Sequence, residues 1–330
     1  MKKQFLVMAM LFSAVAMLTT ACGGGGGGGG AATPAAAVNS GIVYSGVTSQ
    51  AQINATNANS ISASALNGGA IGGALASATG VVQDISSSDP GRARQIIIYE
   101  AVMSALDNID NSGPTIAMSG LVTTKNGSLG GDCGSASTFS VQADDVTGEF
   151  SGTFTFNDFC DGDTSLSGSI NINGRINPDE TGTVNMQFTD LSARSGGDSF
   201  TSSGTMQINI AAASATLKVN ALFQDNNSGL VAKCSDLIMT ITEGTGFVDI
   251  VMSGTFYHPV HGFVVLSTES PLRVFDNDEW PSQGVLVLSG SGATSARLKA
   301  VSATTFSVAA DTNGDSIRDY DSGTQMWAEL

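Results

Sequence analysis

From Ile116 onward, apolar and polar residues alternate along most of the chain. The segments SINING (residues 169–174) and TVNMQF (residues 183–188) place an apolar side chain at every second position. A period of two is typical of a β-strand with one face buried and the other in water. The same pattern recurs in TMQINI, TLKVNALF and FVDIVM. It predicts a β body over residues 115–330, with about 11 to 13 strands.

Short polar turns separate the predicted strands. They are rich in Gly, Asn and Asp, which tolerate the backbone conformations of tight turns. The predicted turns lie at Asn126-Gly127, Asp161-Gly162, Asn177-Pro178-Asp179, Ser195-Gly196-Gly197, Asn226-Asn227 and Glu243-Gly244. Because such short links join antiparallel neighbours, we expect the strands to form a meander.

Two small motifs recur inside the strand patterns. Ser-Gly pairs occur at residues 119–120, 151–152, 167–168, 203–204, 253–254 and 289–290. A Phe-x-Asp-apolar ending occurs at residues 156–159 and 188–191, and Cys-Ser-Asp-Leu at residues 234–237. Glycine within a strand often marks a bulge or a bend. We therefore expect a large antiparallel meander curled as a half-barrel or a barrel, with an N-terminal helix packed on it; a two-sheet β-sandwich is the alternative.

The segment before the β body is predicted to be helical. Asp89 can cap a helix, Pro90 suits its first position, and the apolar residues that follow share one face up to residue 109. A weaker helical pattern rich in Ala, Ser and Asn follows Thr48. We therefore assign residues 41–114 to a helical N-terminal segment.

The chain begins with the features of an export signal. Lys2 and Lys3 precede an apolar stretch from Phe5 to Leu18, and small residues follow. This stretch has 14 residues, whereas a helix that crosses a bilayer needs about 20. Residues 1–21 are therefore predicted to be a signal peptide.

Leu18-Thr19-Thr20-Ala21-Cys22 resembles the lipobox of bacterial lipoproteins, although Thr19 stands where that class usually has Leu. The resemblance implies that Cys22 is lipidated, becomes the N-terminus and anchors the chain in a lipid bilayer. Gly23 to Gly30 has no side chains to bury, so residues 22–40 suit a Gly/Ala-rich tether. Gly23 after the cysteine is similar to the signal that sorts such lipoproteins to the outer membrane. We expect an exported cell-envelope protein.

Charge narrows the range of partners. Removal of Lys2 and Lys3 with the signal leaves 11 basic and 29 acidic residues, a net charge of −18. A body this acidic repels nucleic acid. The expected partners are therefore the bilayer itself, and an envelope protein or an apolar ligand.

Three cysteines remain after Cys22, namely Cys133, Cys160 and Cys234. An oxidising compartment permits one disulfide and leaves one thiol. All three pairings are open, and we favour Cys133 with Cys160, because each lies beside a predicted turn. A buried thiol is the simplest interpretation of Cys234.

One C-terminal segment could bind a cation. The loop DTNGDSIRDYDSG places oxygen ligands at alternate positions of a calcium-type loop: Asp311, Asn313, Asp315, the carbonyl of Ile317, and Asp319. Over about 12 residues the loop resembles those of EF-hand and dockerin type. Calcium would be the cofactor that this resemblance implies.

The loop departs from that pattern in two places. Ser316 replaces the sixth-position glycine, and Ser322 replaces the final bidentate acid. The alternative is a plain acidic hairpin turning at Asn313-Gly314, because Asn-Gly is a strong hairpin signal.

Other candidate chemistry is weaker. The two histidines, His258 and His261, could ligate a metal with Asp276, Asp278 or Glu279, although they also suit a turn between strands. Trp280 could be a ligand platform or a buried lid over the sheet.

These observations favour a non-catalytic envelope lipoprotein that acts as a scaffold or a partner-binding module. A carrier of apolar ligands in a curled β-sheet is the first alternative. An exported glycan hydrolase is the second, and it needs two suitably spaced carboxyl groups.

Overall fold

The computed structural model describes residues 41–66, 123–131, 133, 135–144, 146–161, 164–179, 181–195, 198–276, 278 and 280–327. Cys22, the tether and the helix predicted at residues 90–109 lie outside the described residues, so these predictions stay predictions.

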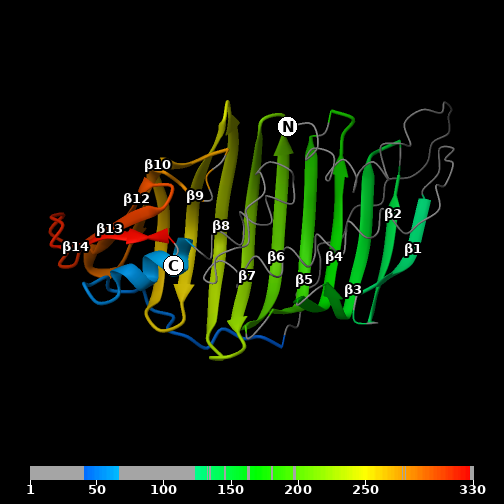
Figure 1. Ribbon diagram of the computed structural model, residues 1–330, viewed down its shortest axis with the longest axis horizontal. Coiled ribbons are helices and arrows are strands. Elements are labelled where there is room, and N and C mark those ends of the chain that lie inside the picture. The colour runs from blue at the N-terminus through cyan, green and yellow to red at the C-terminus, as the bar shows by residue number, and fades with distance from the viewer. Residues whose placement is uncertain are drawn as a thin grey trace.

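Fourteen strands form one antiparallel sheet in which each strand pairs with the next along the chain (Figure 1). The meander is confirmed, and the strand count exceeds the predicted 11 to 13. The strands are β1 (Thr123–Gly130), β2 (Ala136–Ala143), β3 (Glu149–Asp161), β4 (Thr164–Ile176), β5 (Gly182–Ser195), β6 (Asp198–Ala211), β7 (Ser214–Asp225), β8 (Val231–Gly244), β9 (Phe247–His258), β10 (Gly262–Phe275), β11 (Gln283–Ser289), β12 (Ser295–Ser302), β13 (Thr305–Asp311) and β14 (Tyr320–Met326), with one 3-10 turn, η1 (Ser291–Ala293), between β11 and β12.

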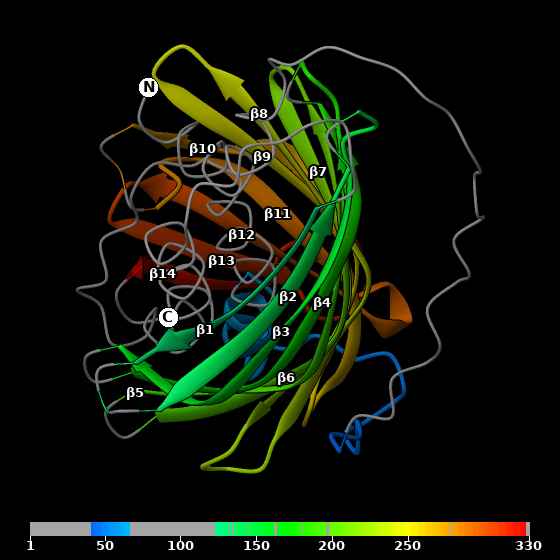
Figure 2. The same ribbon diagram turned by 90° about the vertical axis from the view of Figure 1, so that its right-hand side faces the viewer.

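The sheet curls but does not close, and β1 and β14 are its two edges (Figure 2). The half-barrel form of the prediction is therefore confirmed. The closed barrel and the two-sheet sandwich are wrong, because one open sheet contains all fourteen strands.

Alternation along the strands separates an apolar face from a polar one. Leu217 of β7 pairs with Met239 of β8, and both side chains are buried, whereas the neighbouring Lys218 is exposed. Full burial of a side chain of this size contributes about 1.5–3 kcal/mol. The apolar face belongs to one core that extends from Phe139 in β2 to Ala310 in β13.

Bulged aspartates account for much of the curl. Asp158, Asp190 and Asp236 have φ of +50°, +46° and +46°, and the strand register shifts beside each of them. These are the aspartates of the recurring Phe-x-Asp and Cys-Ser-Asp motifs. A bulge adds one residue to one strand and bends it, so bulges on β3, β5 and β8 curl the sheet.

Each bulge is closed by a polar side chain from a neighbouring strand. Ser167 Oγ accepts from the Asp158 N–H at 3.2 Å, and Ser203 Oγ accepts from the Asp190 N–H at 2.9 Å. Asn220 Oδ1 accepts from the Asp236 N–H at 2.7 Å. At each bulge the N–H group of the aspartate has no backbone partner in the neighbouring strand, and the side-chain oxygen accepts from it instead.

Three glycines of the Ser-Gly pairs, Gly168, Gly204 and Gly254, lie beside the bulges and make room for them, whereas Gly152 pairs in regular register. A Cβ atom on Gly168 would lie 2.4 Å from the carbonyl oxygen of Asp190, and one on Gly254 would lie 2.5 Å from that of Asp236. Their φ angles are +113° and +132°, which residues other than glycine rarely adopt. The Phe-x-Asp and Cys-Ser-Asp motifs therefore mark bends, as predicted, and the Ser-Gly pairs do so at residues 168, 204 and 254.

The helix predicted to follow Thr48 is partly wrong. Residues 41–54, which we call the strap, are irregular and not helical, and they run along one end of the sheet (Figure 1, dark blue). The Ala51 N–H donates to the Phe263 carbonyl at 2.8 Å, and the Phe263 N–H donates to the Ser49 carbonyl at 3.0 Å. The pairing of β11 with β10 ends at Val265. Beyond that residue the strap pairs with β10 instead, at Phe263.

A helix begins at residue 58 and continues to residue 66, where this described segment ends. Asn54 Oδ1 accepts from the N–H groups of Thr56 and Asn57, while Asn57 Oδ1 accepts from the Asn54 N–H at 2.8 Å. This reciprocal cap fixes the helix start. Ala58 and Ile61 are buried in the core, and Figure 2 shows the helix on the concave side of the sheet.

Two predicted turns lie inside strands. Glu243-Gly244 ends β8 and pairs with residues 247 and 248 of β9, so the turn there is at residues 245–246. Asn126-Gly127 lies inside β1 and pairs with residues 139 and 140 of β2. A Cβ atom at Gly127 would lie 2.4 Å from the Phe139 ring, so the glycine serves close packing and not a turn. The turns predicted at residues 177–179 and 226–227 are confirmed.

Candidate functional site

The C-terminal loop joins β13 to β14 through residues 312–319. The two strands of the hairpin alternative are therefore present, but Asn313-Gly314 is not a two-residue turn. Asp311 is buried, and its carboxylate accepts from the N–H groups of Gly314 and Ser316, each at 2.7 Å. Ser316 has a φ of +70° at the position where EF-hand loops have glycine.

The remaining predicted side-chain ligands accept hydrogen bonds from groups within the loop itself. Asp315 Oδ1 accepts from the Ile317 N–H at 2.8 Å, and Asn313 Oδ1 accepts from the Asp315 N–H at 2.9 Å. Asp319 accepts from the side chain of Thr312 at 2.7 Å and from its N–H at 2.9 Å, and these bonds lower the pKa of Asp319. Calcium binding by this loop stays a prediction: among the described residues, no three His, Cys, Asp or Glu side chains are grouped to hold a metal.

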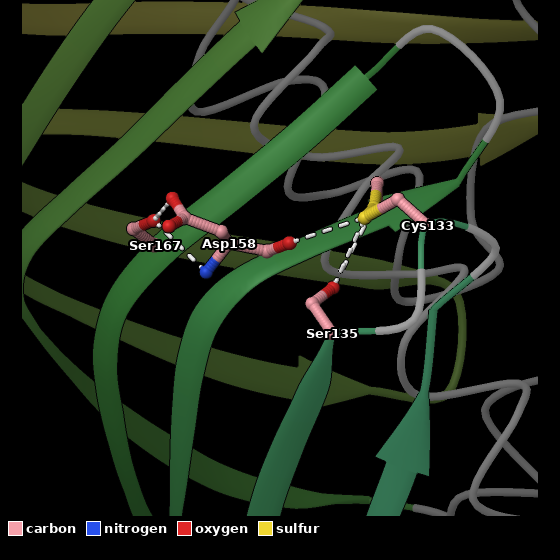
Figure 3. The surroundings of a disulfide bond; sticks show 5 residues. Cys133, Ser135, Asp158 and Ser167 are labelled. Carbon is pink, nitrogen blue, oxygen red and sulfur yellow. Dashed lines mark hydrogen bonds between the residues drawn. A yellow bond between two sulfur atoms is a disulfide. The ribbon is translucent and has the colours of Figure 1, made fainter.

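The favoured disulfide is present. Cys133 and Cys160 are bonded, with their Cα atoms 5.9 Å apart (Figure 3). The bond ties the segment between β1 and β2 to the end of β3, two residues beyond the bulge at Asp158. Cys234 is a buried thiol, and burial raises its pKa to about 12. A thiol with that pKa stays protonated, which makes it a poor nucleophile.

The two histidines lie in the turn between β9 and β10, with ring centroids 4.5 Å apart. His258 Nδ1 accepts from the N–H groups of Val260 and His261 at 3.1 and 3.3 Å. Burial, with a smaller contribution from His261, lowers the pKa of His258 to about 4. The side chain therefore acts as a neutral hydrogen-bond acceptor that shapes the turn, and its Nδ1 lone pair is already used.

The acids suggested as further metal ligands lie elsewhere. Asp276 and Asp278 follow the last residue of β10, whereas the histidines precede its first residue. The structure does not bring them together, and Glu279 lies outside the described residues.

Trp280 is a buried lid and not an exposed platform. Its ring stacks on Trp327 at 5.3 Å between centroids, and Trp327 stacks on Phe306 at 4.6 Å. The Trp327 Nε1–H donates to the Ser302 carbonyl at 3.0 Å, so the polar end of this ring is also paired.

Among the described residues, every carboxyl group with a clearly shifted pKa has that pKa lowered. Hydrogen bonds from Arg273 lower the pKa of Asp249, and Lys218 lowers that of Asp236. Hydrogen bonds from Thr147 and Thr181 do the same for Asp144 and Asp179. A general acid in a glycoside hydrolase needs a raised pKa, so none of these groups suits that role.

Part of the outer face of the sheet, over β2 to β7, is a polar surface of uncharged side chains. Charged residues border it: Lys218 pairs with Gln207 across β6 and β7, and Glu149 pairs with Arg175 across β3 and β4. Two rows run across the strands, one of Gln142, Ser151, Asn173, Asn185 and Gln207, the other of Ser140, Thr153, Asn171, Gln187, Thr205 and Asn220. We call these eleven residues the outer polar face. The longer row crosses six strands and spans about 24 Å, since strands lie about 4.8 Å apart.

Hydrogen bonds link the amides of this face from strand to strand. Asn185 Nδ2 donates to Asn173 Oδ1 at 3.1 Å, and Gln207 Nε2 donates to Asn185 Oδ1 at 3.0 Å. Thr153 Oγ1 donates to Asn171 Oδ1 at 2.7 Å. These bonds order the side chains, which lowers the entropy that a partner loses by binding there.

The sequence carries a signal for this face. The polar positions of SINING, TVNMQF and TMQINI are mostly Asn, Gln and Thr, with charged residues absent from all three segments. Their alignment side by side depends on strand register, which the sequence alone does not give.

Comparisons of this chain with protein families, with curated proteins and with solved structures find no match. Within the part of the chain that the structure describes, no helix combines the length and the apolarity needed to cross a bilayer.

Proposed function

We propose that this protein is a non-catalytic lipoprotein of the cell envelope. In this proposal Cys22 carries the acyl chains, residues 22–40 form the tether, and the curled sheet is a scaffold that binds a partner. The observation that carries the binding role is the outer polar face, an ordered and uncharged surface on a chain whose net charge is −16.

The anchoring half of the proposal rests on the signal and lipobox-like sequence. Export also agrees with the Cys133–Cys160 disulfide, because disulfides persist in oxidising compartments. The residue after Cys22 is glycine, which supports the outer membrane as the destination.

Mass spectrometry of the N-terminal peptide from the membrane fraction tests the anchor. We expect an acylated Cys22 in the wild type, and export of a soluble, unacylated chain when Cys22→Ala is introduced. An unmodified N-terminus in the soluble fraction of the wild type would contradict the proposal.

Site-specific photo-crosslinking in intact cells tests the binding face. A photoreactive residue at Gln207 should give defined crosslinked products, whereas one at Lys299, an exposed residue of β12, should not. Products of equal yield from both positions would show that the outer polar face is not selective.

A carrier of apolar ligands is the second candidate, favoured by the continuous apolar face inside the curl. Extraction of the purified protein with organic solvent, followed by mass spectrometry, tests this role. A lipid recovered in one-to-one ratio with the chain would favour the carrier, and recovery of none would favour the scaffold.

A further inference from the structure

The end of the sheet that meets the strap has its own surface. This strap end consists of the turn between β7 and β8, the turn between β9 and β10, and the strap itself. The strap begins beside Asp190 of β5, and the Gly41 N–H donates to the carboxylate of Asp190 at 3.1 Å. It then passes the turn that follows His258, and the Val47 N–H donates to the Pro259 carbonyl at 3.2 Å.

Four aliphatic side chains of the strap end are exposed to solvent. The exposed fractions are 72% for Val43, 40% for Val47, 47% for Leu230 and 54% for Val260. They come from three separate segments of the chain, which the fold gathers at one end.

Aromatic and basic groups lie beside these aliphatic side chains. The Tyr44 hydroxyl donates to the Val47 carbonyl at 2.8 Å, and its ring meets Tyr257 edge to face at 5.6 Å. Lys233 Nζ lies 4.7 Å from the centre of the Tyr257 ring. Aliphatic, tyrosine and lysine side chains side by side are typical of surfaces that meet the interface of a bilayer.

Carboxylates are not confined to one end of the sheet: the strap end has Asp190 and Asp225, and the opposite end has others. The opposite end carries Asp144, Asp179 and Asp276 in or beside its turns, and hydrogen bonds hold the pKa values of Asp144 and Asp179 below their usual range. Exposed apolar side chains occur at this end as well: Val146, 78% exposed, lies in the turn between β2 and β3, and Phe275, Val301 and Met326 lie near the ends of β10, β12 and β14.

The length of the tether decides which end faces the bilayer. Residues 22–40 number 19, and a flexible chain of that length has a root-mean-square span of about 24 Å. The strands β8 and β10 have 14 residues each, which corresponds to about 46 Å. A lipid at Cys22 would therefore keep the end at Gly41 closer to the membrane than the far end.

We propose that the strap end rests on the lipid bilayer that holds the acyl chains, with Val43, Val47, Leu230 and Val260 entering its interface. This inference rests on the proposed lipid anchor and adds an orientation to it. The outer polar face then stands roughly perpendicular to the membrane, where partners in the envelope can reach it.

Tryptophan quenching by brominated lipid tests the orientation. The lipidated wild type and the variants Val43→Trp, Val260→Trp and Val146→Trp are reconstituted into phosphatidylcholine vesicles with and without brominated acyl chains. Native Trp280 and Trp327 are buried and give the baseline. We expect a loss of emission in brominated vesicles for Val43→Trp and Val260→Trp, and the baseline signal for Val146→Trp, the matched control at the opposite end.

The same samples separate failure of this inference from failure of the anchor. Flotation with the vesicles and an acylated Cys22, without quenching at residues 43 and 260, would overturn the orientation and leave the anchor intact. Equal quenching at residues 43, 146 and 260 would also overturn it. An unmodified Cys22 with no flotation would overturn both proposals. Circular dichroism identical to that of the wild type establishes that each variant is folded.

Discussion

The bulge glycines give the sharpest stability prediction. Gly254 of β9 lies beside the bulge at Asp236, and its φ is +132°. An alanine there would be held in a strained backbone conformation, at a cost of about 1–3 kcal/mol. Its Cβ atom would also lie 2.5 Å from the Asp236 carbonyl oxygen, and relief of that overlap costs about another 1–3 kcal/mol. We therefore expect Gly254→Ala to lower the free energy of unfolding by about 4 kcal/mol.

Gly229→Ala is the matched control. Gly229 has a φ of +72°, and a Cβ atom there would meet nothing within 4 Å. The alanine is then destabilising only because of its left-handed backbone conformation, which costs about 1–2 kcal/mol of unfolding free energy. The two variants thus share a positive φ and differ in the contact with a backbone carbonyl.

Urea unfolding of the mature chain carrying Cys22→Ser measures both changes. The fluorescence of the buried Trp280 and Trp327 pair reports unfolding, and equal m-values establish that the midpoints can be compared. A loss at Gly254→Ala no larger than that at Gly229→Ala would refute the view that the glycines are required by the bulges.

Three further predictions concern the cysteines and His258. Replacement of Cys133 and Cys160 by alanine should lower the free energy of unfolding by about 3.5 kcal/mol. The disulfide joins two residues that are 27 positions apart, and without it the unfolded chain gains conformational entropy. An unchanged urea midpoint would contradict this prediction. Burial lowers the pKa of His258 to about 4, whereas an unfolded histidine titrates near 6.5. The unfolded state therefore takes up the proton first, and stability should fall as the pH drops from about 6.5 to 4. His258→Gln should reduce that fall in urea midpoints measured at pH 7 and pH 5, and an unchanged fall would show that other groups cause it. Cys234 should react with iodoacetamide only after unfolding, and rapid labelling of the folded chain would contradict its burial.

Local patterns predicted the features of this fold that depend on local chemistry. The period-two alternation identified the strands because one face of each strand is buried. The Ser-Gly and Phe-x-Asp motifs identified the bends because only particular residues tolerate a bulge. Among three possible pairings, the turns beside each cysteine favoured Cys133 with Cys160, and the structure contains that disulfide.

Features that depend on distant partners were missed. The strap has a helical composition, yet Ala51 and Ser49 pair with Phe263 more than 200 residues away. Asn126-Gly127 has a turn sequence, yet Phe139 packs against its glycine. In both cases a tertiary contact outweighs a local preference of at most about 1 kcal/mol per residue.

The structure of β14 bears on how a partner would bind. An open sheet has unpaired edges, and a regular edge strand invites pairing with another chain. β14 is irregular: its register with β13 shifts between Ser307 and Ala309, and the Val308 N–H donates to the Ser322 side chain. Gly323 has a φ of +67°, which breaks the extended conformation.

This irregularity makes strand addition at β14 unfavourable, since a partner strand would find few N–H and C=O groups in register. The outer polar face, by contrast, is regular across six strands. We therefore expect partner contacts on the face and not on the β14 edge. The variant Gly323→Val, which favours an extended β14, tests this view by sedimentation velocity: it should promote self-association, whereas the wild type stays monomeric. Self-association of the wild type through this edge would contradict it.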